Sequence, residues 1–168
     1  MGFQGNGVTV LNFDGTYRPQ KRLFCFPHEW IDLADVPETN LYCREAALAE
    51  IERRLRRRRT RGAVLIGSGN YHYVTYLLLR EISEPFTLVL FDHHTDAEQD
   101  ESSLISCGSW VAHALQYAQL RKVVIVGPSF SPRNLRLSPN ITVFPFADHD
   151  EWPNELLKAI PTGSVYIS

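Results

Sequence analysis

The chain has 168 residues, of which 44% are hydrophobic and 21% charged, as expected for a globular protein with its own core rather than for a disordered one. Its formal net charge of −2 argues against a nucleic-acid partner, and no apolar run approaches the roughly 18 residues that a membrane span requires. Cys25, Cys43 and Cys107 are odd in number and lack CxxC spacing, and no basic and apolar leader opens the sequence, so we predict a cytoplasmic location.

Apolar runs predict seven strands, at residues 8–13, 22–26, 62–69, 86–92, 122–127, 141–146 and 164–168. Helical patterns lie between them, at about residues 41–59, 71–82, 107–120 and 154–160. We expect a turn at Asp14-Gly15 between the first two strands, a loop over residues 27–39, and Thr39 or Asn40 as the cap of the first helix. Strands that alternate with helices indicate an α/β fold with a mainly parallel sheet, and several unbroken apolar runs suit strands buried on both faces.

The stretch "LVLFDHHTD" runs directly from a buried strand into side chains that bind metal ions. In a parallel sheet, ligands bind beyond the carboxyl ends of the strands. In an extended segment, Asp92, His94 and Asp96 would point to one face, since they are two residues apart. Oxygen and nitrogen ligands together favour Mn²⁺, Zn²⁺ or Fe²⁺, and carboxylates can bridge two such ions. The alternative is that Asp92 caps the next segment while the other side chains lie in a solvated loop.

A second candidate ligand follows the preceding predicted strand. The string "GSGNYH" places His72 after that strand, where a helix is expected to begin. Because the carboxyl ends of parallel strands share one edge of a sheet, His72 is expected at the same edge as Asp92. Taken alone, His72 is better explained as a polar residue in a first helical turn.

Three strings in order, "VLIGSGNYH", "LVLFDHHTD" and "SCGSWVAHAL", resemble the arginase–agmatinase (ureohydrolase) family. That family has a strand ending GGDH, a strand ending DAHxD and a later His-Gly. The resemblance implies that residues 1–168 form a single arginase-like domain, a three-layer α/β sandwich with a mainly parallel sheet. It also implies two manganese ions, with zinc or iron as other choices, held by His72, Asp92, His94 and Asp96. In the family a bridging hydroxide attacks a guanidinium carbon and releases urea, so Asp96 would also be catalytic.

The sequence departs from the family pattern at three places. Tyr71 stands where the family has Asp, and Cys107 stands where it has the His of His-Gly. We expect Cys107 at a helix N-terminus, where the dipole favours a thiolate, and count it as a site residue. The final "SVYIS" resembles the family's Ser-x-Asp-x-Asp strand without its two Asp, so we expect a fold that is incomplete at the C-terminus and an inactive chain.

Other interpretations stay open at this point. The departures favour a non-catalytic or regulatory metal-binding protein, and "DHH" is also found in manganese phosphoesterases, although no earlier DxD strand accompanies it here. The basic run at 53–61 is interpreted as the solvated end of a helix, and "ADHDEW" at 147–152 as a loop. The expected partner is a small molecule with a guanidino or amide nitrogen, with no nucleic acid or membrane partner. A homo-oligomer is compatible with the sequence.

Overall fold

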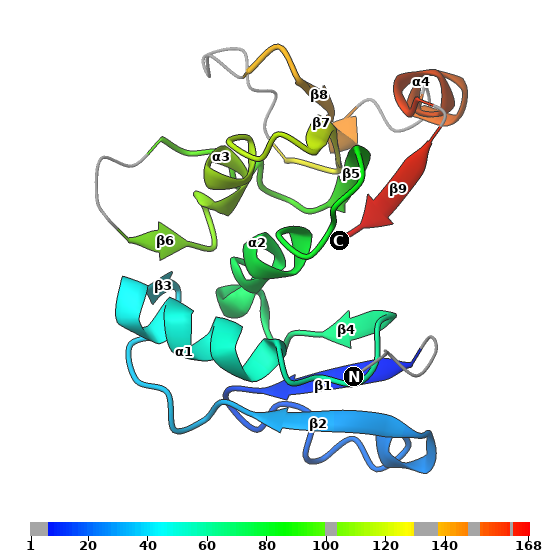
Figure 1. The fold of residues 1–168 in the computed structure, drawn as a ribbon. Coiled ribbons are helices and arrows are strands. Elements are labelled where there is room, and N and C mark those ends of the chain that lie inside the picture. The colour runs from blue at the N-terminus through cyan, green and yellow to red at the C-terminus, as the bar shows by residue number, and fades with distance from the viewer. Residues whose placement is uncertain (1–6, 100–103, 130–137, 148–151, 162) are drawn as a thin grey trace. The chain divides into compact units, whose positions relative to one another are not determined.

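The computed structural model describes residues 7–99, 104–129, 138–147, 152–161 and 163–168 (Figure 1). The chain divides into two compact units. Unit 1 comprises Met1–Val74 and Asp100–Cys107, and unit 2 comprises Thr75–Gln99 and Gly108–Ser168. Both units combine strands with helices, and the larger sheet of each unit is entirely parallel, which confirms the predicted α/β class with mainly parallel pairing.

Unit 1 contains a three-stranded sheet in the order β2-β1-β4. Its strands are β1 (Val8–Asn12), β2 (His28–Asp32) and β4 (Ala63–Leu65). The predicted strand at 22–26 is wrong, because Leu23–Cys25 is a 3-10 turn, and the predicted loop at 27–39 contains β2. The physical reason is the direction of pairing. A parallel partner of β1 needs a crossover that returns the chain to the same end of the sheet, so residues 13–27 are used as connection.

The predicted turn at Asp14-Gly15 is confirmed. The Asn12 side-chain oxygen accepts a hydrogen bond from the Gly15 N–H at 3.0 Å, and the Asp14 carboxylate accepts one from the Thr16 N–H at 2.9 Å. Gly15 has a φ of +78°, a conformation that glycine adopts without steric cost. The turn therefore ends β1 as expected, although it does not lead into a hairpin.

A second, antiparallel pair in unit 1 joins β3 (Tyr42–Cys43) to β6 (Ile105–Ser106). The predicted helix at 41–59 is correspondingly shorter, because α1 spans Glu45–Leu55 and its N-cap residue is Arg44 rather than Thr39 or Asn40. Leu41 has a φ of +67°, so the chain cannot continue a right-handed helix there. The apolar spacing nevertheless identified the buried face, which consists of Ala47, Ile51 and Leu55.

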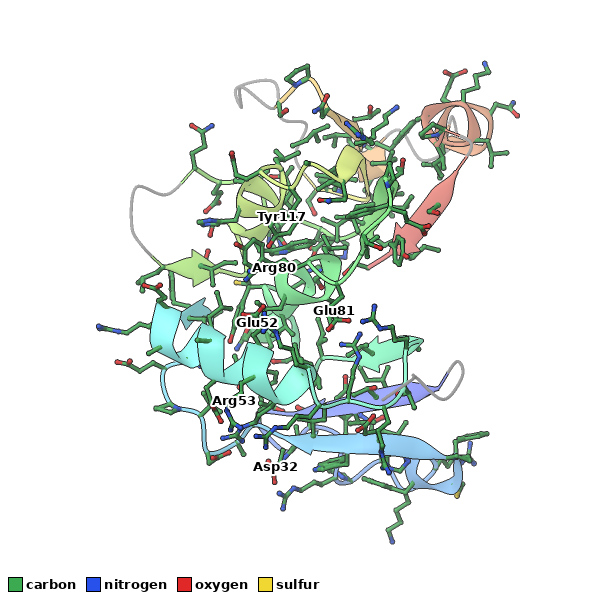
Figure 2. The ribbon with its side chains drawn as sticks, in the orientation of Figure 1. Asp32, Glu52, Arg53, Arg80, Glu81 and Tyr117 are labelled. Atoms are coloured by element: carbon green, nitrogen blue, oxygen red, sulfur yellow. The ribbon has the colours of Figure 1, made fainter. Side chains whose placement is uncertain are left out.

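The basic run at 53–61 is largely engaged in ion pairs within unit 1. Arg53, labelled in Figure 2, donates two hydrogen bonds of 2.6 Å to the Glu50 carboxylate. Arg54 binds both Glu50 and Asp35, and Arg56 binds Glu52 at 3.0 Å. These ion pairs agree with the interpretation of the basic run as a charged helix end. They give no reason to assign nucleic-acid binding to it.

Unit 2 contains a four-stranded parallel sheet in the order β8-β7-β5-β9. Its strands are β5 (Phe86–Phe91), β7 (Leu120–Val126), β8 (Ile141–Phe144) and β9 (Ser164–Ile167). The two central strands β5 and β7 are the unbroken apolar runs, and most of their residues are buried, as expected for strands with both faces covered.

Two helices, α2 and α3, are shorter than predicted, whereas α4 begins two residues earlier than predicted and ends one residue earlier. The predicted helix 71–82 is a 3-10 turn, Gly69–Tyr71, followed by α2 (Val74–Leu79). The predicted helix 107–120 is α3 (Trp110–Ala114), since β6 and a turn occupy the residues before it and β7 begins at Leu120. Helix α4 (Trp152–Ala159) follows residues 148–151, so most of the predicted "ADHDEW" loop lies outside the described residues.

Within the part of the chain that the structure describes, no helix has the length and apolar character needed to span a bilayer.

Candidate metal centre

The loop after β5 begins with Asp92, and it is held to the neighbouring strand β7. The Asp92 N–H donates to the Val126 carbonyl at 3.1 Å. Gly127 has a φ of +103°, and a Cβ built there would lie 3.3 Å from the Asp92 carbonyl oxygen. Glycine therefore serves both the backbone conformation and the close approach. The Asp92 carboxylate accepts a hydrogen bond of 2.9 Å from the His94 N–H, so the chain turns directly after the strand.

Asp96 lies beside Asp92 in this loop. One carboxylate oxygen of each lies within 4.8 Å of the other, and the Asp96 residue is only 5% exposed. Asp96 has a φ of +49°, in the left-handed region that few residues other than glycine enter. Two neighbouring carboxylates of which one is buried repel each other in the absence of a cation, and their hard oxygen atoms suit a divalent metal ion. The donor set of this loop thus fits the metals that the sequence predicts.

The Asp96 carboxylate has a buried partner in unit 2. The Trp110 indole N–H donates to Asp96 Oδ2 at 2.7 Å, and Trp110 is fully buried. The Val111 N–H also donates to the Asp96 carbonyl at 2.9 Å. Our sequence interpretation did not identify Trp110. The only available signal was that a tryptophan in an apolar helix usually needs an acceptor for its N–H.

His94 lies at the surface of the same loop. Its ring is 3.3 Å from the Asp92 carboxylate, and its side chain is 78% exposed. This contact places His94 beside one of the two carboxylates, while its role as a ligand stays a prediction. The neighbouring His93 uses its carbonyl to accept a hydrogen bond of 3.0 Å from the Ser129 N–H.

His72 belongs to unit 1, where it follows the 3-10 turn after β4. Its N–H donates to the Gly69 carbonyl at 3.1 Å, and the side chain is half-buried. The expected position at the start of a helix is therefore approximately correct. The structure describes His72 within its own unit, so its participation in a metal site stays a prediction.

Tyr71, which replaces the family's Asp, is a core residue of unit 1. Its ring stacks on Phe13 with a centroid separation of 4.3 Å and an interplanar angle of 8°. Burial raises the pKa of Tyr71, with a smaller contribution from the Asp14 charge. The ring also covers Gly67, whose N–H donates to the Tyr17 hydroxyl at 2.8 Å. Tyr71 therefore contributes aromatic packing at a position where the family pattern has a carboxylate.

Cys107 ends the β3–β6 ladder, where its N–H donates to the Leu41 carbonyl at 3.0 Å. Helix α3 begins only at Trp110, so the predicted position of Cys107 at a helix N-terminus is wrong. The ladder explains the difference, because it holds the chain extended up to Cys107. The half-buried Cys107 belongs to unit 1 together with Cys43, and burial raises the pKa of the Cys43 thiol to about 11.

The whole described fold, and not only the three motifs, agrees with one family of proteins. The profile of the arginase family matches residues 9–168. This chain belongs to the arginase family. An uncharacterized protein of Thermotoga maritima is 30% identical over 161 residues, which is 96% of this chain and 61% of that protein.

Three solved structures share the arginase fold with this family member. A hypothetical agmatinase from Burkholderia thailandensis gives a TM-score of 0.65 at 18% identity, over 99% of this chain and 62% of its own. Proclavaminate amidino hydrolase from Streptomyces clavuligerus gives 0.67 at 12% identity, over 99% and 67%. Formimidoylglutamase from Bacillus subtilis gives 0.65 at 12% identity, over 99% and 65%. The arginase-family chain thus spans about three fifths to two thirds of the length of these relatives.

Proposed function

We propose that the complete protein is a metal-dependent hydrolase of the ureohydrolase class, which cleaves a carbon–nitrogen bond in a small linear amidine or guanidino compound. The observation that carries this proposal is the pair of neighbouring carboxylates, Asp92 and Asp96, directly after strand β5 in an arginase-family chain. The three structural neighbours are named as a hypothetical agmatinase, an amidino hydrolase and a formimidoylglutamase. Each name refers to an enzyme that acts on this kind of substrate.

The proposed ligands are His72, Asp92, His94 and Asp96. The two aspartates are supported by their geometry, and the two histidines by the order of the motifs in the sequence. Manganese is the proposed metal, as a pair of ions in the complete site. When bound, such a pair supplies a hydroxide that is nucleophilic near neutral pH. In this proposal, the role of the chain is to hold the ions through carboxylate oxygens. Asp96 is buried away from bulk water.

A non-catalytic metal-binding protein is the second candidate, and one observation favours it. Tyr71 and Cys107 replace a carboxylate and an imidazole of the family pattern, and Tyr71 is fixed in the core by its stacking on Phe13. Proton transfer by the family's His would have no direct substitute, since a thiol has an unperturbed pKa of about 8.5. Membership in the arginase family gives no support to the phosphoesterase interpretation of Asp92-His93-His94.

Calorimetric titration with Mn²⁺ tests the proposed site. We expect residues 1–168 to bind Mn²⁺ weakly, and Asp92→Asn or Asp96→Asn to reduce the affinity by about tenfold or more, since each removes a charged ligand. Glu98→Gln is the matched control, because Glu98 is an exposed carboxylate two residues from Asp96. Equal affinities for the wild type and both aspartate variants would show that the metal binds elsewhere.

We also propose a cytoplasmic location for this protein. The support is the cysteine pattern of the sequence, since Cys25, Cys43 and Cys107 are odd in number and lack CxxC spacing. This pattern is compatible with a reducing compartment.

A further inference from the structure

We propose that Trp110 is a positioning residue of the metal site: its indole N–H holds one oxygen of Asp96, so that the metal ion binds through the other. This inference rests on the proposed function, because it assigns a role to Trp110 in a site built on Asp96. The carboxylate and the indole both belong to unit 2, and their contact is part of the interior of that unit.

Helix α3 holds Asp96 at two points. Trp110, its first residue, donates through Nε1 to Asp96 Oδ2 at 2.7 Å, a short distance for an N–H···O hydrogen bond. The next residue, Val111, donates its backbone N–H to the Asp96 carbonyl at 2.9 Å. One contact orients the side chain and the other positions the backbone, so both ends of the aspartate are determined by the same helical turn.

The backbone of Asp96 needs such support. A φ of +49° is unfavourable for a residue with a side chain, and it persists only where the surrounding structure determines it. Strained conformations of this kind are concentrated at functional sites, where they place a side chain that regular structure would direct elsewhere. Here the strained residue is the buried carboxylate beside Asp92, and the helix that holds it contributes a fully buried donor.

Because the Trp110 indole is uncharged, it can orient the Asp96 carboxylate without neutralising its negative charge. An indole N–H is a neutral donor without acceptor capacity. An arginine or lysine at the same place would also orient the carboxylate, but its charge would oppose the binding of a cation. Trp110 therefore orients Asp96 and leaves its negative charge available to a divalent ion. A metal-bound carboxylate commonly has a hydrogen-bond partner on its other oxygen, and loss of such partners weakens metal binding.

A purely structural role for Trp110 leads to different expectations. In that case the indole fills the core of unit 2, Asp96 merely accepts its N–H, and changes at Trp110 alter stability but not metal affinity. The positioning role requires that the indole N–H responds to the metal and that its removal weakens metal binding in a protein that still folds.

The first measurement is the indole N–H signal of Trp110 in ¹H–¹⁵N correlation spectra of residues 1–168 during titration with Zn²⁺, which is diamagnetic. We expect the Trp110 signal to shift and to saturate with the affinity found by calorimetry, because the metal draws electron density from the shared carboxylate. The Trp30 signal serves as an internal reference, since this ring packs against Phe24 and His28 in unit 1. A Trp110 signal that stays in place while Zn²⁺ binds would overturn the proposal.

The second measurement compares metal affinities of variants. Trp110→Phe removes the donor and should weaken Mn²⁺ and Zn²⁺ binding by about tenfold to a hundredfold, the usual effect of losing a partner of a metal ligand. Trp30→Phe is the matched control and should leave the affinity unchanged. If Trp110→Phe does not fold, benzothienylalanine at position 110 replaces the indole N–H by sulfur with nearly the same ring volume.

The outcomes distinguish this inference from the function on which it rests. If residues 1–168 bind neither metal, the inference is wrong, and the proposed function is decided separately by chelator-sensitive hydrolysis by the complete protein. If the wild type binds metal while the folded position-110 variant binds it equally well, the inference is wrong and the proposed function stands. A weaker affinity in a folded variant, together with the shift of the Trp110 signal, supports both.

Discussion

At the scale of single residues, the balance at Asp96 between burial, strain and charge is the central physical feature. The residue is 5% exposed, has a φ of +49° and accepts a hydrogen bond from a buried indole. Each of the first two properties costs free energy in the folded state, and a cation next to Asp92 would offset part of that cost. Metal binding should therefore stabilise unit 2 as well as serve the reaction.

Asp96→Ala should abolish hydrolysis by the complete protein, because it removes a proposed ligand of the metal pair. It should also lower the free energy of unfolding by about 1–3 kcal/mol, since the Trp110 N–H is left buried without an acceptor. Urea unfolding and turnover measure the two effects separately. Asp96→Asn keeps an acceptor and tolerates positive φ, so it should lose turnover while remaining close to wild-type stability.

Cys107→Ser is the comparison for this pair of variants, and we expect a smaller loss of turnover from it. A half-buried thiol at the end of the β3–β6 ladder can be replaced by a hydroxyl without removing a proposed ligand. A loss as large as that of Asp96→Ala would mean that Cys107 takes a direct part in the chemistry.

At the scale of elements, ion pairs connect α1 to the segment that follows β2. Arg54 donates 2.6 Å and 2.7 Å hydrogen bonds to the Asp35 carboxylate, and it also binds Glu50 one helical turn earlier. It reaches the Asp32 carbonyl at the end of β2 at 2.7 Å. One guanidinium therefore joins the helix to the end of β2 in unit 1, so Arg54 has a structural role within that unit.

These pairs predict a dependence of stability on pH. The Arg54 hydrogen bonds lower the pKa of Asp35 to about 2, and the Arg53 and Arg54 hydrogen bonds lower the pKa of Glu50 to about 2. Because both folded values lie below the ordinary ones of 3.8 and 4.5, the contribution is complete above about pH 4.5 and is lost as the pH falls towards 2.

Urea unfolding of the wild type and Arg54→Met between pH 6 and pH 2 checks this dependence. The stability difference between the two proteins should be small, since Asp35 is exposed and Glu50 is only partly buried, and should shrink as the pH falls through this window. High salt should reduce the difference at pH 6 as well. If the stability difference is independent of both pH and salt, Arg54 acts through packing of its aliphatic side-chain carbons and not through its charge.

At the scale of the whole molecule, the chain spans 61% of its Thermotoga maritima relative and 62–67% of the three structural neighbours. Its proposed ligands are two carboxylates and two imidazoles, which is a small set for a pair of divalent ions. A site for two divalent ions is therefore expected to need ligands in addition to these four.

We accordingly expect no measurable urea release from arginine or agmatine by residues 1–168 with added Mn²⁺. The reaction needs a hydroxide activated by its metal pair and a proton donor for the leaving amine. The complete protein should hydrolyse some amidine or guanidino compound in a reaction that chelators abolish. A colorimetric urea assay with and without chelator decides the matter, and chelator-insensitive urea production by residues 1–168 would contradict the proposed mechanism.

The α/β class, the central strands and the two carboxylates after β5 could be predicted from the amino-acid sequence. Short unbroken apolar runs such as residues 86–91 suit strands in the interior of a parallel sheet, and polar residues that follow such a run are expected beyond the strand end. Asp92 and Asp96 were therefore predictable as neighbours in one loop. The buried face of α1 was predictable for the same reason, because its apolar residues repeat with the helical period.

The segment that pairs with β1, the first residues of the helices and the contacts that hold Asp96 could not be predicted, because they depend on tertiary contacts. Strand β2 has a weak apolar pattern of its own, and its pairing depends on contacts with β1 that no local signal encodes. The starts of α1 and α3 were set by the β3–β6 ladder, which joins residues 42–43 to residues 105–106. The Trp110–Asp96 hydrogen bond likewise depends on how α3 packs in unit 2. Such side-chain packing cannot be predicted from local sequence patterns.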